Sequence, residues 1–379
     1  MIALAGCGPS PPEAERLVLK PAEFADLAGW KDDHVAAAIP ALARSCAAIA
    51  KQPDDAEHGP AGTSLKVRDW RPACAALAEV PKDDDDAARA YLQRWFRPYA
   101  ASGGKEKEGL FTGYYEPELK GARVEGGGFA IPLYGRPADL VTVNLGLFDD
   151  SLKGKHITGR VDAGQLKPYP DRAAIEAGAL KDAPTILWVD DAIELFFLQI
   201  QGSGRVTLPD GSVVRVGYAV SNGRSYHAIG KLLADRGVMK VEDITLQSLK
   251  AWLRAHPDEA KALMDQNPSY VFFREVPGDG PFGAEGVVLT PGRSLAVDNR
   301  FISYGAPLWL DAESPDGVGR LRRLVVAQDR GGAIKGPVRG DLFWGAGAEA
   351  EKLAGPMRSK GTYYVLLPRE APKDALPKG

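Results

Sequence analysis

The sequence lacks several patterns that mark large classes of protein. No stretch approaches the roughly 20 consecutive apolar residues of a membrane-spanning helix, so the body of the protein is expected to stay outside the bilayer. Neither sign of charge dominates, because 47 Lys and Arg against 50 Asp and Glu give a net charge of −3, which argues against a nucleic-acid partner. The 3 cysteines show no Cys-x-x-Cys spacing and the 5 histidines are scattered, so we expect no metal site and no cofactor.

What is present predicts a folded, turn-rich protein. With 379 residues, the chain is long enough for two domains, and 45% hydrophobic residues suffice for a core. The 43 glycines and 29 prolines favour a body rich in strands and turns over a helical bundle.

The N-terminal quarter is expected to be helical. Apolar residues recur at helical spacing in residues 33–51 and 67–80, and the acidic run 83–86 predicts the solvated start of a third helix. Cys46 and Cys74 fall on neighbouring predicted helices. They form either a disulfide or two buried thiols.

Short apolar segments broken by Gly and Pro predict strands from about residue 110 to 209, followed by a hairpin turn at 208–212 and its second strand at 213–218. Helical spacing returns at 226–266, where His256 and Pro257 separate two helices. The last third predicts a compact β-barrel, with a helix at 348–353 and strands at 287–290, 307–310, 324–328, 342–344 and 363–367.

The first residues end in Leu4-Ala5-Gly6-Cys7, which resembles the site where a bacterial lipoprotein signal is cleaved and its cysteine acylated. Only a remnant of a signal precedes Cys7, so either the recorded start lies too far downstream or the match is chance. The first alternative makes residues 1–20 a signal remnant and tether, with a lipid anchor to the outer membrane and a periplasmic location.

Three aspartates stand out as chemical candidates in the last third. Asp329 follows an apolar run and precedes Arg330 and two glycines, which allows a ligand to approach a carboxyl group at a barrel rim. Asp298 and Asp341 flank it in sequence, and neighbouring carboxylates would push their pKa values apart. Turn formation by Asp329 and loop bracing by the other two are the structural alternatives.

Residues 198–205 (Leu-Gln-Ile-Gln-Gly-Ser-Gly-Arg) combine amide, hydroxyl and glycine residues after an apolar triplet. Fixed donors and acceptors beside aromatic rings suit a sugar polymer, so this segment predicts a carbohydrate cleft. A nucleophilic role for Ser203 is disfavoured because no histidine lies in its motif.

Four separated motifs together resemble the membrane-bound lytic transglycosylase A family. They are Phe-Thr-Gly-Tyr-Tyr-Glu-Pro at 111–117, Gln-Ile-Gln-Gly-Ser-Gly at 199–204, Gln-Asn-Pro-Ser-Tyr-Val-Phe-Phe at 266–273, and Asp-x-Gly-Gly-Ala-Ile-Lys-Gly at 329–336 with its continuation to Gly345. The resemblance covers residues 105–367 in unbroken order and includes the family's C-terminal three-aspartate domain.

The resemblance implies a mainly β fold with N-terminal helices. A double-psi β-barrel domain (21–115 plus 277–379) would carry an inserted smaller β-barrel domain (116–276), with a groove between the two. The family implies Asp329 as the catalytic residue and Asp298 and Asp341 as supporting residues. Expected glycan contacts are Thr112, Tyr114, Tyr115, Gln201, Ser203, Gly204, Asn267 and Ser269.

The implied partner is the glycan strand of peptidoglycan, and the implied enzyme is a monomeric exotransglycosylase, a carbon–oxygen lyase acting on polysaccharide. It would leave 1,6-anhydromuramic acid ends. Two other functions stay open: a peptidoglycan-binding protein without catalysis, and a hydrolase that uses Asp329 with Asp341 or Glu285. The residues themselves do not distinguish cleavage at strand ends from interior cleavage, or show whether peptide stems are needed.

Overall fold

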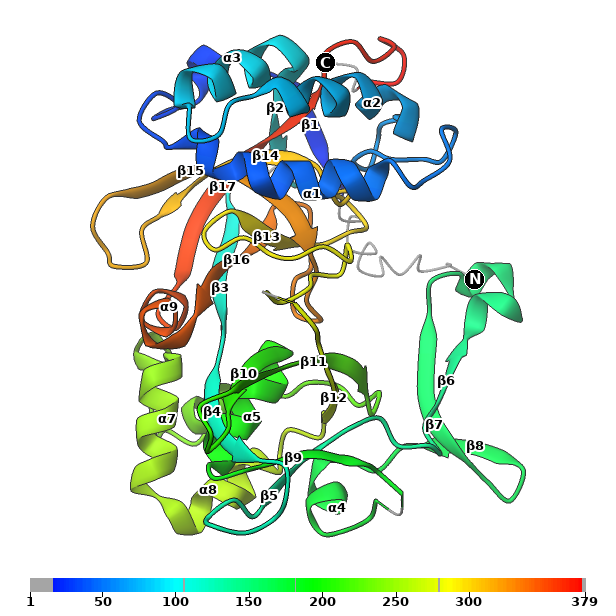
Figure 1. The fold of residues 1–379 in the computed structure, drawn as a ribbon, viewed down its shortest axis with the longest axis vertical. Helices are drawn as coiled ribbons and strands as arrows, with labels where there is room; N and C mark the ends of the chain where they lie inside the picture. Colours follow the sequence, from blue (N-terminus) through cyan, green and yellow to red (C-terminus); the bar gives the residue numbers. More distant parts are fainter. Residues whose placement is uncertain (1–15, 105, 181, 279, 377–379) are drawn as a thin grey trace, which may run out of the picture.

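The computed structural model describes residues 16–376 except 105, 181 and 279, so the predicted lipidation site Cys7 lies outside the described residues. Two large β-sheets and one small sheet make up most of the fold, and helices pack at both ends (Figure 1). The prediction of a mainly β protein with N-terminal helices is confirmed. Within the described part of the chain, no helix has the length and apolar character needed to cross a membrane.

The first sheet closes into a six-stranded barrel because β17 pairs with both β14 and β3. Outside this closed ring, β2 pairs with the C-terminal half of β17, and β1 pairs with β2. Its strands are β1 (Val18–Pro21), β2 (Phe96–Ser102), β3 (Gly109–Glu116), β13 (Ser294–Val297), β14 (Pro307–Glu313), β15 (Arg320–Asp329), β16 (Arg339–Ala346) and β17 (Arg358–Pro368).

Three helices cover one end of this barrel: α1 (Ile39–Ile49), α2 (Val67–Ala76) and α3 (Asp85–Trp95) (Figure 1). Helix α1 buries Ile39, Leu42 and Ile49 at helical spacing, and these side chains join the barrel residues in one core. Asp84 caps α3 by accepting a hydrogen bond from the amide of Ala87, so the predicted acidic helix start is confirmed.

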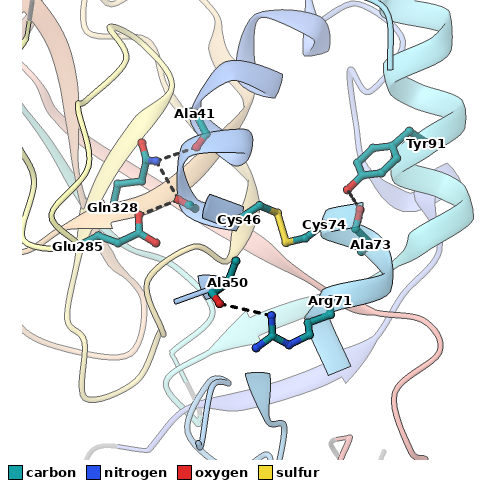
Figure 2. Close-up of a disulfide and its surroundings, with 10 residues drawn as sticks. Ala41, Cys46, Ala50, Arg71, Ala73, Cys74, Tyr91, Glu285 and Gln328 are labelled. Atoms are coloured by element: carbon teal, nitrogen blue, oxygen red, sulfur yellow. Dashed lines mark hydrogen bonds between the residues drawn. A yellow bond between two sulfur atoms is a disulfide. The ribbon is translucent and has the colours of Figure 1, made fainter. Parts of the chain in front are cut away.

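Cys46 of α1 and Cys74 of α2 form a disulfide with a Cα–Cα distance of 5.4 Å, which decides between the two alternatives left open by the sequence. Figure 2 shows that the bond joins the two helices beside Glu285 and Gln328, which belong to the barrel side of the molecule. The disulfide thus fixes α1 where it meets strand β15.

The second sheet has six strands in the order β12-β11-β10-β4-β9-β5, and a bridge between Gly135 and Phe273 brings its two edges together. This arrangement is the smaller barrel-like body at the other end of the molecule (Figure 1). Its strands are β4 (Glu118–Ala122), β5 (Ile131–Tyr134), β9 (Thr185–Val189), β10 (Ser203–Thr207), β11 (Val213–Ser221) and β12 (Val271–Glu275). The predicted hairpin is confirmed as the antiparallel pair β10–β11.

Most of the remaining elements pack around this second sheet or extend from it. The small sheet projects as a separate arm in Figure 1 and consists of β6 (Val141–Asn144), β7 (His156–Asp162) and β8 (Gln165–Pro168). The remaining helices are α4 (Arg172–Glu176), α5 (Ala192–Gln201), α6 (Ile229–Asp235), α7 (Leu246–Ala255), α8 (Pro257–Met264) and α9 (Gly347–Ala354). Of these, α9 packs against β3 and β16 of the barrel. Helices α7 and α8 meet at His256 and Pro257, as predicted.

Two expectations of strands are wrong. Within the region predicted as strands, residues 192–201 form helix α5, because Asp191 caps its first amides and Gly202 ends it with a φ of 82°. Residues 287–290 form no strand and make only one bridge, between Val288 and Phe282. The barrel strand in this region is β13, which begins at Ser294, seven residues after the predicted start.

Replacing both cysteines, Cys46→Ala with Cys74→Ala, should lower the free energy of unfolding by about 2–4 kcal/mol, because the open chain gains conformational entropy when unfolded. Chemical denaturation with and without a reducing agent measures this. The reductant should destabilise the unmodified protein and leave the double variant unchanged. Equal stability of oxidised and reduced protein would contradict the prediction.

Candidate active site

The carboxylate of Asp329 lies at the end of β15 and accepts three hydrogen bonds. The hydroxyl of Tyr114 donates to Oδ2 at 2.8 Å. The backbone amides of Ala284 and Arg330 each donate to Oδ1, also at 2.8 Å. Three donors from three different segments therefore fix the orientation of this one carboxyl group.

The strand register places the second carboxylate beside the first. Strand β13 lies between β15 and β16, and its residue Ala296 is the Cα partner of both Asp329 and Asp341. On the other side of β16, Asp341 is aligned with Thr112 of β3 and accepts a hydrogen bond from its hydroxyl at 2.7 Å. Thr112, Tyr114, Asp329 and Asp341 thus come together across four neighbouring strands.

Burial raises the pKa of both carboxyl groups. For Asp329 it outweighs the three hydrogen bonds and the charge of Arg330, which lower the pKa. For Asp341, burial and to a lesser extent the nearby charge of Asp329 raise the pKa to about 6, against the lowering effects of Thr112 and Arg339. The pair is therefore suited to keep a proton at a pH where an exposed aspartate would have lost it.

Asp298 is buried, and its contacts differ from those of the other two aspartates. Burial opposes its ionisation, but hydrogen bonds from the Arg300 side chain and from the amides of Gly336 and Arg300 prevail and lower its pKa. Gly336 ends the loop that begins after Asp329. Asp298 thus anchors that loop at its far end, which fits the loop-bracing alternative.

Tyr115 points away from the carboxylate pair and is buried. Its hydroxyl donates to Glu351 of α9 at 3.0 Å and accepts from the ammonium of Lys250, which also contacts Glu194 and Glu351. This buried polar network joins α5 and α7, beside the second sheet, to β3 and α9 of the barrel.

Gln201, Ser203 and Gly204 lie where helix α5 passes into β10. The side-chain oxygen of Gln201 accepts from the backbone amide of Tyr115 at 3.2 Å. A Cβ at Gly204 would lie 2.4 Å from Leu198 and 2.9 Å from the carbonyl of Pro117, so close packing requires glycine there. Ser203 is half-buried at the start of β10.

Asn267 and Ser269 lie in the loop before β12. Asn267 is buried, and its side-chain oxygen accepts from the amides of His227 and Ser269. Arg172 donates to the carbonyls of both Asn267 and Ser269. These contacts brace the loop, and a contact of either residue with glycan stays a prediction.

The sequence did not single out Ala284, because its part is played by a backbone amide that any residue type supplies. It lies at the edge of a cavity of about 650 Å³ between α1 and residues 284–288, which Arg44, Lys51, Gln52 and Glu285 also line. Among the described residues, no group of three or more His, Cys, Asp or Glu side chains could hold a metal ion.

The fold and the site define a class of protein: a closed β-barrel joined to a second sheet, with two neighbouring carboxyl groups on the barrel. The family models "MltA specific insert domain" and "3D domain" match residues 110–274 and 293–367. The chain belongs to the membrane-bound lytic murein transglycosylase A family, as the resemblance of its motifs predicted.

Relatives of this chain include proteins named membrane-bound lytic murein transglycosylase A. The one from Vibrio cholerae is 30% identical over 325 residues, which cover 83% of this chain and 80% of that protein. The one from Escherichia coli K12 is 34% identical over 263 residues, 68% of this chain, and the match spans 65% of the length of that protein.

Solved structures show the same fold. The membrane-bound lytic murein transglycosylase from Agrobacterium tumefaciens superimposes with a TM-score of 0.82 at 32% identity, covering 94% of this chain and 99% of that one. The structure of E. coli MltA with bound chitohexaose gives a TM-score of 0.63 at 27% identity, covering 95% and 93%.

Tyr114→Phe should raise the pKa of Asp329, because the lost hydroxyl stabilises the charged carboxylate. Carbon-13 NMR titration of the aspartate carboxyl groups measures this directly. Tyr364→Phe is the matched control, since Tyr364 makes no described contact with Asp329. An unchanged titration of Asp329 in the Tyr114 variant would show that the hydrogen bond does not tune this group.

Proposed function

We propose that this protein is a lytic transglycosylase that cleaves the β-1,4 bond between N-acetylmuramic acid and N-acetylglucosamine in peptidoglycan. The observation that carries this proposal is the half-buried, triply hydrogen-bonded carboxyl group of Asp329, whose pKa is raised by burial. Family membership supports it, and so does the related structure of E. coli MltA with bound chitohexaose.

In the proposed reaction, protonated Asp329 donates its proton to the glycosidic oxygen as the bond from that oxygen to the anomeric carbon breaks. The 6-hydroxyl of the same muramic acid then bonds to the anomeric carbon, and Asp329 removes its proton. The nucleophile belongs to the substrate, so its high effective concentration replaces an enzyme-bound water. The products are an N-acetylglucosamine end with a free 4-hydroxyl and a 1,6-anhydromuramic acid end, and no water is consumed.

The neighbouring groups have distinct parts in this proposal. Asp341, with a pKa of about 6, adds negative charge beside Asp329 when it ionises, which favours the protonated acid. Tyr114 and the amides of Ala284 and Arg330 stabilise the carboxylate that forms after proton donation. Asp298 supports the site by holding the loop after Asp329.

The glycan is proposed to lie between the barrel (21–115 plus 277–379) and the inserted body (116–276). Thr112 and Tyr114 would contact the sugars nearest to the cleaved bond, because both lie beside the carboxyl pair. Gln201 and Ser203 would lie further along the strand, and we propose that the enzyme acts as a monomer.

A periplasmic location with a lipid anchor at Cys7 on the outer membrane is part of the same proposal. The disulfide between Cys46 and Cys74 supports an oxidising compartment, because such bonds are rare in reducing ones. The relatives' name, membrane-bound, supports the anchor.

Asp329→Asn should reduce the release of anhydro-ended fragments from purified sacculi at least about 100-fold, because the amide cannot donate or accept the proton. Mass spectrometry of the soluble fragments measures this. Asp311→Asn is the matched control, since Asp311 pairs with Arg320 and Arg322 on another part of the barrel.

The same spectra separate the other functions. Fragments heavier by one water would make the protein a hydrolase. Binding of sacculi without release of fragments would make it a binding protein. Substantial activity in the Asp329 variant would contradict the assignment of the acid.

A further inference from the structure

The residue after Ala284 takes part in a second polar network, directly behind the segment that contacts Asp329. The amide of Glu285 donates to the carbonyl of Gln328 at 3.1 Å, and its carboxylate accepts from the hydroxyl of Ser45 at 2.7 Å. Gln328 immediately precedes Asp329 in β15. Figure 2 shows Glu285 and Gln328 side by side where α1 meets the barrel.

Donor and acceptor can be assigned for each hydrogen bond of this network. The amide nitrogen of Gln328 donates to the carbonyl of Ala41 and to the Ser45 hydroxyl, both at 2.9 Å, and its oxygen accepts from Ser294. Because the Ser45 hydroxyl accepts from Gln328, its single proton is free to be donated to Glu285. Ser45 and Gln328 have no exposed surface, so water does not compete for these bonds.

Close packing holds the same segment on strand β15. A Cβ at Gly283 would lie 2.3 Å from the carbonyl oxygen of Gln328, so residue 283 rests directly on the strand. Residues 283–285 are therefore fixed at three successive points: the packing of Gly283, the Ala284 amide on Asp329, and Glu285 on Ser45 and Gln328.

We infer that Glu285 is a positioning residue for Asp329, which acts through Ser45 and Gln328 to hold the Ala284 amide on Oδ1 of that carboxyl group. This inference rests on the proposed role of Asp329 as the acid. It assigns Glu285 a task other than that of the second carboxylate of a hydrolase, because the described hydrogen bonds of Glu285 go to α1 and β15. Burial raises the pKa of Glu285 to about 7, so near neutral pH a glutamine is a fair substitute for its neutral form.

The test is the pH dependence of kcat for release of anhydro-ended fragments. In Glu285→Ala the segment loosens and the Ala284 hydrogen bond to Asp329 is weakened. Because that bond lowers the pKa of Asp329, its loss should raise the pKa and move the alkaline limb of the profile to higher pH. We expect kcat to fall roughly 10-fold, as for the loss of one hydrogen bond to a charged group, with KM unchanged.

The profile also reflects the other charged and titratable groups at the site. Tyr114, Arg330 and Asp341 face Asp329. Tyr304 interacts with both Asp329 and Glu285. Arg44, Lys51 and His58 line the cavity beside Glu285. These groups are identical in all variants compared. A displaced limb in Glu285→Ala therefore reports the change at residue 285.

Glu285→Gln should keep kcat and the alkaline limb of the pH profile as in the unmodified protein, because the amide oxygen still accepts from Ser45. Ser45→Ala should shift the limb in the same direction as Glu285→Ala, and it carries the test if the latter variant does not fold. Gln52→Ala, which changes a neutral residue lining the same cavity, is the matched control. A purely structural role would lower the amount of folded enzyme without moving the limb.

An unchanged limb in both Glu285→Ala and Ser45→Ala would overturn the inference while leaving the proposed function intact. If the unmodified protein released no anhydro-ended fragments, the proposed function would fail. The inference would then be judged by carbon-13 NMR, where the pKa of Asp329 must rise in Glu285→Ala and stay the same in Glu285→Gln.

Discussion

The site depends on the closure of the barrel by strand β3. This strand pairs with β16 on one side and with β17 on the other, so residues from the first third of the chain are held against residues from the last. The hydrogen bond from Tyr114 to Asp329 joins residues 215 positions apart, and that from Thr112 to Asp341 joins residues 229 apart. Without this closure the two carboxyl groups would keep their strands but lose the hydroxyl donors Tyr114 and Thr112.

The same strand also connects the two bodies of the molecule. Residue Glu116 ends β3 in the barrel, and Glu118 begins β4 in the second sheet. Beside this connection, buried Lys250 of α7 contacts Glu351 of α9 and Tyr115 of β3. A buried ammonium without its partners would be costly, so this network favours one arrangement of the two bodies over others. The position of any ligand between them is constrained accordingly.

The sequence predicted helices and strands correctly where apolar spacing and turn residues within the segment itself determine the structure. The N-terminal helices follow from apolar spacing, the hairpin β10–β11 from its Pro-Asp-Gly turn, and most barrel strands from apolar runs between glycines. Helix α5 was mistaken for strand because its apolar run is nearly continuous. The deciding signals were its ends, Asp191 and Gly202.

The motifs drew attention to Asp329, but its surroundings could not be predicted from spacing. Two of its three donors are backbone amides, which leave no trace in residue type, and one of these comes from a loop 45 residues away. The alignment of Asp329 and Asp341 through Ala296 depends on a shift of register in the β13–β15 pair. Such a shift is a property of the paired strands and cannot be found in either strand alone.

A single acid that also acts as the base must satisfy two opposing demands. It has to keep a proton before the bond breaks, which burial and the neighbouring Asp341 favour, and it has to be stabilised as a carboxylate afterwards, which requires donors already in place. A buried carboxyl group without donors would hold its proton too firmly, and an exposed one would lose it too early. The combination of burial with three fixed donors meets both demands, and the network behind Ala284 keeps one of those donors in position when the charge of Asp329 changes.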